Sequence, residues 1–346
     1  MTAYDSRADF SAQRVAVCGD LIADQYIYAS PQRLSREAPV MVLRHEHEML
    51  GAGGAANVAR NLAALGARVS AFGAIGVDES GAGVRAALGE VGIDTLGLRE
   101  SRTWRTPTKT RVLAAEARRF PHQVLRIDRE PAGPLAPELR AEVVAHLAAA
   151  RSASDALVVS DYGYGLVGEE LAAESRAWAA EGRVVVLDPR ERIAGFEGIS
   201  AMTPNIGELA RFQGIDQARL DDPADLRAAS LALLERVGCQ WLLVTRGNLG
   251  MALFGEGVGP QGLAVAAAGK REVTDVSGAG DTSASVFAVA LAAGLGAPEA
   301  MRLANLAAGV VVMEIGTAVC PLDRLRELQG DREAPELTEL GEVGPR

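Results

Sequence analysis

The feature that most constrains the fold is an alternation of short apolar runs with longer segments of helical periodicity. The apolar runs, predicted to be strands, span 14–19, 69–74, 156–160, 184–187, 201–203 and 242–245. The predicted helices between them span 55–65, 81–91, 137–150, 168–181 and 223–237. Apolar runs without polar alternation are typical of parallel strands buried on both faces. This order predicts an α/β fold with a central, mostly parallel sheet flanked by helices.

Two segments depart from this alternation, because polar, charged and threonine residues interrupt their extended patterns. Segments 33–44 and 106–128 are predicted to be extended and to pair as a small second sheet. This sheet would form a β-lid, whose bounds we place at about 33–44 and 104–128. The last third is alanine-rich, and segments 279–293 and 299–314 are predicted to be helices packed on one another. We therefore expect one domain with its lid over 14–328. An N-terminal tail (1–13) and a disordered acidic C-terminal tail (329–346) would flank it.

The charge balance disfavours some partners. The chain carries 35 Lys and Arg against 45 Asp and Glu, a formal charge of −10, so we expect neither nucleic acid nor an anionic membrane surface as a partner. Glycine and proline interrupt the longest uncharged stretch, 282–298, which is therefore not predicted to span a membrane. With no signal-peptide pattern at the start, the expected location is the cytoplasm.

The strongest local motif is Val-Thr-Asp-Val-Ser-Gly-Ala-Gly-Asp-Thr at 273–282, just before a long apolar helix. Gly278, Ala279 and Gly280 allow close approach of a ligand to the backbone, and the amides at a helix N-terminus favour an anion. Asp281 would act as a general base on a hydroxyl while these amides hold a transferring phosphoryl group. The alternative is that Asp281 is only a favourable acidic residue in a first helical turn.

Two further groups of residues follow predicted strands. The segment Gly-Ala-Gly-Gly-Ala-Ala-Asn at 51–57 opens a helix, and its Asn57 suits a polyhydroxylated ligand, although a tight helix start explains the glycines equally well. Asp20 and Asp24 follow the first strand, at the edge where ligands of open α/β sheets bind. Their carboxylates suit sugar hydroxyls, or one of them only caps the next turn.

A third group lies past the later strands, in the motifs Asp-Pro-Arg (188–190), Thr-Pro-Asn-Ile-Gly-Glu (203–208) and Val-Thr-Arg-Gly (244–247). Asn205 and Glu208 are three residues apart and share one face of a starting helix. Glu208 would hold a hydrated Mg²⁺ near triphosphate oxygens, or it completes a capping box with Asn205.

The predicted lid is basic in an acidic protein. Segment 103–129 contains seven basic residues against two acidic ones, including Lys109, one of only two lysines in the chain. Basic side chains that alternate along a strand face one side together and can clamp a phosphate. We therefore expect an acceptor that already carries a phosphate, held by Lys109, Arg111 and Arg126. The alternatives are a solvated basic face or a subunit interface.

Taken together and in this order, the motifs resemble those of the ribokinase-like (PfkB-type) carbohydrate kinases over about residues 14–328. The resemblance implies an ATP-dependent sugar kinase of ribokinase-like fold, with Asp281 as base and the amides of 278–281 as anion hole. It implies sugar contacts from Asp24, Gly53, Gly54 and Asn57. It implies that ATP and Mg²⁺ lie near Asn205, Glu208, Thr245, Arg246, Gly247, Gly278 and Gly280, with Asn305 near the adenine. It also implies a monovalent cation such as K⁺ at Asp275 and Ser277, and a homodimer formed through the lid.

A closer resemblance is to the D-glycero-β-D-manno-heptose 7-phosphate kinases of lipopolysaccharide-core synthesis. It rests on segments 19–24, 33–40, 53–57, 108–113, 125–128 and 159–162. The chain departs from that pattern at Ser277, which replaces a threonine, and at Tyr164 and Arg190, which replace lysines. Many of those relatives carry a fused nucleotidyltransferase, for which we expect no room in 346 residues.

Other function classes fit less well. A nicotinamide dehydrogenase would need Gly-x-Gly-x-x-Gly after a strand and an acidic residue about 20 positions later, which the chain lacks. A non-catalytic regulator that binds sugar or nucleotide would be expected to lose Asp281 or the amide cradle, and both are present. Within the kinases, the alternative acceptor is another sugar or sugar phosphate.

Overall fold

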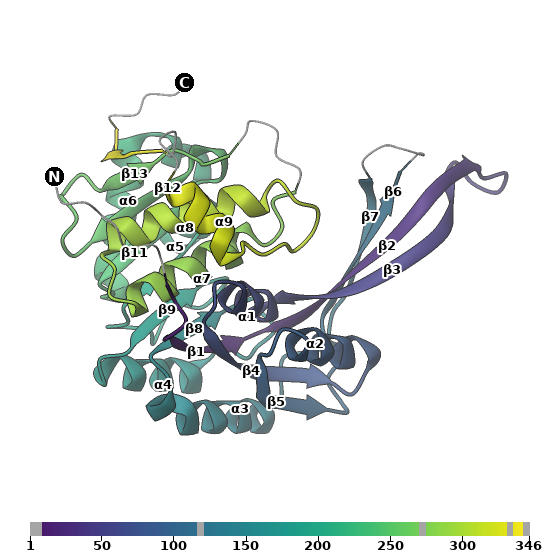
Figure 1. Ribbon diagram of the computed structural model, residues 1–346, viewed down its shortest axis with the longest axis horizontal. Helices are drawn as coiled ribbons and strands as arrows, with labels where there is room; N and C mark the ends of the chain where they lie inside the picture. Colours follow the sequence, from purple (N-terminus) through teal and green to yellow (C-terminus); the bar gives the residue numbers. More distant parts are fainter. Residues whose placement is uncertain (1–8, 116–120, 270–274, 331–334, 342–346) are drawn as a thin grey trace.

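A ten-stranded, mostly parallel sheet forms the centre of the structure (Figure 1). The structure is a computed structural model and describes residues 9–115, 121–269, 275–330 and 335–341. Its strand order is β14-β13-β12-β11-β10-β9-β8-β1-β4-β5, and all pairs from β11 to β5 are parallel. The parallel strands are β1 (Arg14–Gly19), β4 (Arg68–Gly76), β5 (Asp94–Ser101), β8 (Ala156–Ser160), β9 (Val184–Asp188), β10 (Ala201–Met202) and β11 (Trp241–Thr245). An antiparallel edge consists of β12 (Met251–Gly255), β13 (Leu263–Val265) and β14 (Leu337–Glu339).

Helices cover both faces of this sheet. The core of one face includes side chains from α1 (Ala55–Ala64), α2 (Glu79–Gly89), α7 (Ala279–Ala292), α8 (Ala297–Val311) and α9 (Leu322–Gln329). The other face packs against α3 (Pro137–Ala150), α4 (Glu169–Ala180), α5 (Ile206–Gln213) and α6 (Pro223–Val237). Short 3₁₀ turns span Arg151–Ala153, Gln217–Asp221 and Gly247–Leu249.

Strand β1 shows why the apolar runs lack polar alternation. Val15 and Val17 belong to the core of one face, and Ala16 and Cys18 belong to the core of the other. Successive side chains of a strand point to opposite faces, so a sheet with helices on both faces needs apolar residues at every position. The predicted α/β architecture is confirmed, and α7 and α8 do pack on one another.

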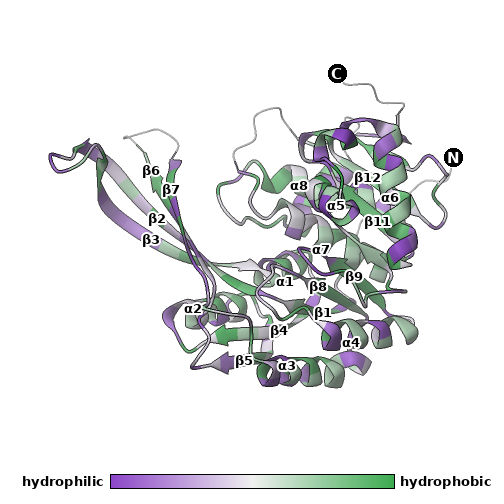
Figure 2. Ribbon diagram, turned by 180° about the vertical axis from the view of Figure 1, so that it is seen from behind, coloured by the Kyte–Doolittle hydropathy of each residue, from purple (hydrophilic) through white to green (hydrophobic). Residues whose placement is uncertain are grey.

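The lid is a separate four-stranded sheet of order β3-β2-β6-β7 that extends from the body (Figure 1). Its strands are β2 (Leu21–Leu34), β3 (Met41–Gly54), β6 (Thr108–Ala114) and β7 (His122–Arg129). The prediction that segment 33–44 is itself a strand is wrong, because its middle is the turn between β2 and β3. Segment 106–128 is a hairpin whose positions 116–120 lie outside the described residues. In Figure 2 many residues of the lid strands are polar, whereas the residues of the central strands are largely hydrophobic.

Both predicted tails contain ordered residues. Phe10, in the segment predicted to be an N-terminal tail, is fully buried in the core. The prediction of a disordered C-terminal tail is wrong for residues 337–339, because β14 pairs antiparallel with β13. Residues 1–8, 331–334 and 342–346 lie outside the described part of the chain. Within that part, every helix is too short or too polar to cross a membrane.

Candidate functional site

Asp281 lies in the first turn of α7, three residues after Gly278. The backbone conformation of Gly278 is one that only a residue without Cβ adopts easily. Gly278 caps the helix with φ of 80°, and a Cβ there would come within 2.7 Å of the Asn57 amide nitrogen. The Asp281 side chain is nearly buried, at 3% exposure, and accepts two hydrogen bonds. Asn57 donates to Oδ2 at 2.8 Å, and the Tyr162 hydroxyl donates to Oδ1 at 2.8 Å.

The electrostatics of Asp281 reflect this environment. Burial raises the pKa of Asp281 to about 6, while the hydrogen bonds from Asn57 and Tyr162 act in the opposite direction. The negative charge of Asp24 raises this pKa further, and Lys109 lowers it. The carboxylate is therefore ionised near neutral pH and titrates close to the range in which a general base is effective.

The loop after β8 carries Tyr162 and is held by a buried carboxylate. Asp20 accepts hydrogen bonds from the backbone amides of Tyr162 at 2.9 Å, Tyr164 at 3.0 Å and Leu166 at 3.3 Å. Burial raises the pKa of Asp20 to about 6. The predicted sugar contact of Asp20 does not fit this geometry, because its oxygens serve the backbone of the loop.

Asp24 lies against the glycines of segment 51–57, at the position where the sequence predicts sugar contacts. A Cβ on Gly53 would come within 2.3 Å of the Asp24 carboxylate, so only glycine leaves Asp24 in place. Gly54 has φ of 58° and lies against the backbone of Asp20. Asp24 also forms a buried ion pair with Arg111, whose guanidinium lies over the Tyr26 ring. The predicted role of Arg111 as a phosphate ligand does not fit this position, since its side chain is buried against Asp24 and is not among the residues that line the neighbouring cavity.

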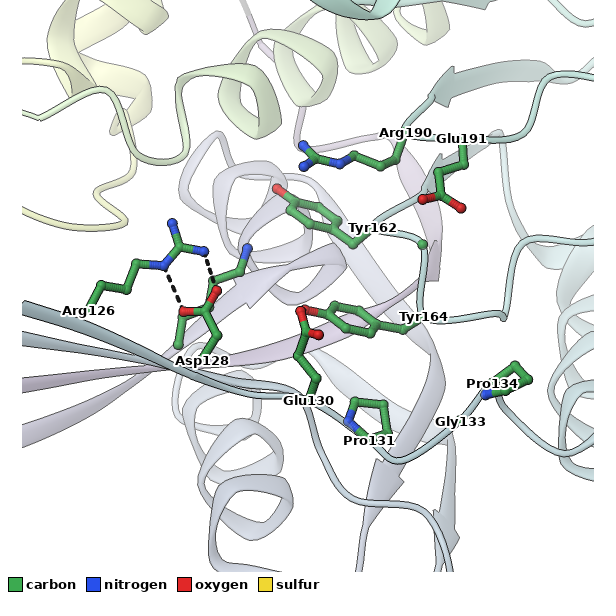
Figure 3. A pocket seen from close by; sticks show the side chains of 12 residues that line it. Arg126, Asp128, Glu130, Pro131, Gly133, Pro134, Tyr162, Tyr164, Arg190 and Glu191 are labelled. Atoms are coloured by element: carbon green, nitrogen blue, oxygen red, sulfur yellow. Dashed lines mark hydrogen bonds and ion pairs between the residues drawn. The ribbon is translucent and has the colours of Figure 1, made fainter.

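A cavity of about 510 Å³ opens beside Tyr162, between the lid and the 161–166 and 188–192 loops (Figure 3). Three cationic side chains line it, Lys109 and Arg126 from the lid and Arg190 from the loop after β9. The Arg190 side chain extends over the cavity beside Tyr162 in Figure 3. Acidic residues line it too, and Arg126 is paired with Asp128 at 2.6 Å. Two of the three predicted phosphate ligands thus share one cavity.

Five of the predicted ATP residues gather at the ends of β10 and β11, whereas Gly278 and Gly280 lie at the start of α7 and Asn305 lies in α8. Asn205 forms a bridge with Thr245, which places the starts of α5 and of the 246–250 turn side by side. Asn205 and Glu208 form a full capping box, with Glu208 N donating to Asn205 Oδ1 at 2.9 Å and Asn205 N donating to Glu208 Oε2 at 2.8 Å. Arg246 and Gly247 follow directly, the latter with φ of 58°.

Two predicted residues are engaged with backbone elsewhere. Asn305 on α8 donates to the Ala266 carbonyl at 2.8 Å, just after β13. Asp275 accepts from Ser277 N at 2.9 Å and from Gly316 N at 3.0 Å, so it joins the segment before α7 to the loop after α8.

A further carboxylate, that of Asp188, is affected by the charges of both the predicted magnesium residue and the predicted base. The pKa of Asp188, at the end of β9, lies well above its usual range because of burial and the charges of Asp281 and Glu208. Burial also raises the pKa of Glu208. Within the described residues no three His, Cys, Asp or Glu side chains converge on one metal position. Mg²⁺ retains most of its waters and needs only one or two carboxylates, so Asp188 and Glu208 fit a hydrated ion.

Two residues of the motifs take part in the site without a role that the sequence indicates. Tyr162 belongs to the segment 159–162 and Asp188 to the motif 188–190, but nothing local shows which way their side chains point. Asp161, next to Tyr162, accepts from the backbone amides of Gly163 and of residues 190–192 and so joins the two loops that border the cavity.

Comparison with known proteins decides the class of this site. The family profile described as pfkB family carbohydrate kinase matches residues 12–324. The chain belongs to the pfkB family of carbohydrate kinases. It is therefore a sugar kinase, and a kinase of this family uses ATP with a divalent metal.

Curated relatives of this kinase share more than a third of its residues. It is 40% identical over 318 residues to a protein of Citrifermentans bemidjiense named bifunctional protein HldE, covering 91% of this chain and 63% of the relative. The protein of the same name from Geobacter sulfurreducens is 38% identical, covering 97% and 68% respectively. The kinase thus spans about two thirds of the length of these relatives.

Solved structures confirm the ribokinase-like fold of this kinase. Arabidopsis thaliana ribokinase, complexed with ribose and ATP, superposes with a TM-score of 0.69 at 22% identity, covering 92% of this chain and 99% of that one. Escherichia coli phosphofructokinase-2, in complex with potassium, gives 0.73 at 19% identity, covering 91% and 97%.

Replacement of Asp20 by alanine is expected to destabilise the kinase. It removes the acceptor of three backbone donors, and such buried groups cost about 1 kcal/mol each, so the free energy of unfolding should fall by roughly 2–4 kcal/mol. Chemical denaturation measures this loss. Asp20→Asn keeps one acceptor oxygen and should lose less. Equal stability of Asp20→Ala and wild type would contradict the assigned role.

Proposed function

We propose that this kinase phosphorylates a sugar that already carries a phosphate, namely D-glycero-β-D-manno-heptose 7-phosphate, and forms the 1,7-bisphosphate. The observation that carries this proposal is a cluster of three cationic side chains, Lys109, Arg126 and Arg190, in the cavity lined by Tyr162, whose hydroxyl donates to the buried Asp281. A phosphate can accept charge-assisted hydrogen bonds from these side chains, and Lys109 and Arg190 are available for it without breaking the Arg126–Asp128 pair. The relatives at about 38–40% identity, and the resemblance to heptose 7-phosphate kinases, support the same acceptor.

The chain's own residues account for the transfer. Asp281 accepts the proton of the attacking hydroxyl, while Asp24 and Asn57, with Gly53 and Gly54 giving close access, orient the sugar. The backbone amides of 278–281, at the start of α7, face the charge that develops on the transferring group. An acceptor oxygen bonds to the γ-phosphorus as the bond from phosphorus to the β-phosphate oxygen breaks, and ADP leaves.

For the nucleotide, we assign Asn205, Thr245, Arg246 and Gly247 to ATP, with Asn305 towards the adenine. Asp188 and Glu208 would hold Mg²⁺ through water, and the ion would neutralise charge on the phosphate oxygens. Asp275 and Ser277 would hold K⁺ beside the anion hole. Because the reaction consumes ATP, we place this kinase in the cytoplasm.

The lid supports a proposed homodimer. Its outer strand β7 is exposed at every position, and Val124, Leu125 and Ile127 leave 53%, 53% and 42% of their surface open. Val40 and Met41, at the start of β3, are also exposed. Open apolar strands of this kind are suited to pairing with a second copy.

An acceptor panel tests the proposed substrate. ADP release with ATP·Mg²⁺ is measured for D-glycero-β-D-manno-heptose 7-phosphate, sedoheptulose 7-phosphate, fructose 6-phosphate, ribose and fructose, each with and without K⁺. We expect the heptose phosphate to exceed the free sugars in kcat/KM by roughly 100-fold or more, because the free sugars have no phosphate to pair with the cationic side chains of the cavity. A preference for a free sugar would refute the proposed acceptor and leave the kinase class intact. A preference for another sugar phosphate would keep the phosphate site and change the sugar.

A further inference from the structure

Tyr162 lies between the lid and the predicted base and contacts both. Its hydroxyl donates to Asp281 Oδ1 at 2.8 Å. The Lys109 ammonium lies over the Tyr162 ring, 4.8 Å from its centroid. The backbone amide of Tyr162 is fixed by Asp20 at 2.9 Å. One side chain therefore links Lys109, a lid residue that lines the cavity, to a carboxylate on α7.

We propose that Tyr162 is a positioning residue for phosphoryl transfer. Its hydroxyl orients and stabilises the ionised Asp281 carboxylate, and its ring packs against the Lys109 ammonium and holds it in position. This inference rests on the proposed role of Asp281 as general base. It adds a residue for which neither the motifs nor the comparisons provide a role.

The geometry gives Tyr162 a function that Asn57 cannot perform alone. Asn57 holds Oδ2 and Tyr162 holds Oδ1, so together they fix the plane of the carboxylate and leave each oxygen one further acceptor direction. A single donor would leave the carboxylate free to rotate about its Cβ–Cγ bond. Fixing the base in the geometry of attack is a recognised source of rate enhancement.

The hydroxyl of Tyr162 is suited to stabilising a carboxylate. Burial and the nearby Asp281 charge hold the pKa of Tyr162 well above its usual range, so the hydroxyl remains a donor at every working pH. The other groups that act on Asp281 are the amide of Asn57 from α1 and the charges of Asp24 from β2 and Lys109 from β6. Of these, Asp24 opposes ionisation of Asp281, and Lys109 and Asn57 favour it. Asp188 from β9 is affected in turn, because the charge of Asp281 helps to raise the pKa of Asp188.

The test is the pH profile of Tyr162→Phe, which removes the hydroxyl and keeps the ring. Loss of a hydrogen bond to the charged form raises the pKa of Asp281, so the acid limb of kcat/KM should move up by about one pH unit. Activity should recover towards wild type at higher pH, and the acceptor KM should change little because Lys109 keeps its seat. Tyr162→Leu removes the ring as well, and should raise the acceptor KM in addition.

Tyr164→Phe is the matched control. Tyr164 lines the same cavity, but its hydroxyl contacts Glu130 at 3.3 Å rather than Asp281, so the acid limb should keep its midpoint whatever the rate. A purely structural role of Tyr162 would lower kcat at all pH values equally. An unmoved acid limb in Tyr162→Phe would overturn the proposal.

A measurement without turnover separates this inference from the proposed function. The hydrogen bond favours the charged carboxylate, so the stability lost in Tyr162→Phe should be larger at about pH 8 than at about pH 5, below the Asp281 pKa. Denaturation curves at both values measure this difference. If no acceptor is phosphorylated but the pH-dependent loss appears, the kinase assignment of Asp281 fails while its link to Tyr162 stands. A loss that is equal at both pH values would overturn the link itself.

Discussion

Asp281→Asn is expected to lower kcat by about 10²–10⁴-fold, the range for removal of a general base. Asparagine can still accept hydrogen bonds from Tyr162 or Asn57 through its one carbonyl oxygen, so the pocket should keep its shape. It cannot take a proton from the acceptor hydroxyl. The loss should therefore appear in kcat with smaller changes in the KM of ATP and of the acceptor, as measured by steady-state kinetics.

The pH dependence of kcat/KM in the wild-type enzyme is a second test of the role of Asp281. Burial raises the pKa of Asp281 to about 6, and only the ionised form accepts a proton. The kcat/KM should therefore be constant well above this pH and fall tenfold per unit below it, and Asp281→Asn should lose this limb.

Asp225→Asn is a matched control, since Asp225 also lies in the first turn of a helix, α6, but pairs with Arg219 on the surface. It should keep full activity. If Asp281→Asn behaved in the same way as Asp225→Asn, Asp281 would be only a favourable residue at the start of its helix.

Lys109→Met is expected to raise the acceptor KM by roughly 10–100-fold, because hydrogen bonds to charged groups contribute about 1.5–3 kcal/mol. Methionine has a similar length and can occupy the space over the Tyr162 ring, so the loss isolates the charge. Burial lowers the pKa of Lys109, and a bound phosphate would favour its charged form. The KM of ATP should change by less than about threefold, because Lys109 lines the acceptor cavity.

Arg126→Ala and Arg33→Ala provide comparisons for the acceptor KM of Lys109→Met. Arg126 is more exposed and already paired with Asp128, so its removal should cost less than that of Lys109. Arg33 lies exposed at the far end of β2 and should have no effect on either KM. An unchanged acceptor KM in both Lys109→Met and Arg126→Ala would refute the phosphate site.

The sequence alone predicts most of the central architecture. Strands β1 and β8 and helices α3 and α6 begin and end where the patterns place them, because each carries its own apolar periodicity and local start and stop signals. The same is true of local motifs. The capping box of Asn205 and Glu208 needs only residues three positions apart, and the structure confirms it.

Strand β2 was missed because its local pattern does not show its environment. Its first residues are buried beside the body, and its end is exposed in the lid, so one strand changes from core to solvent along its length. Strand β14 was missed for a related reason. Three residues in an acidic segment form a strand only because β13 offers an open edge.

In the site, the sequence by itself determined which residue types are present, namely the glycine turn before α7, Asp281, Asn57 and the basic lid. Only the tertiary structure decided how they are used. Asn57 and Asp281 are 224 positions apart, and Tyr162 and Asp281 are 119 apart, yet each pair is joined at 2.8 Å. Local sequence patterns carry no information on contacts across such separations, because the topology of the sheet and the packing of α1 against α7 bring the partners together. For the same reason only the structure shows that Asp24 neutralises Arg111, that Asp20 holds a loop, and that Tyr162 joins Lys109 to Asp281.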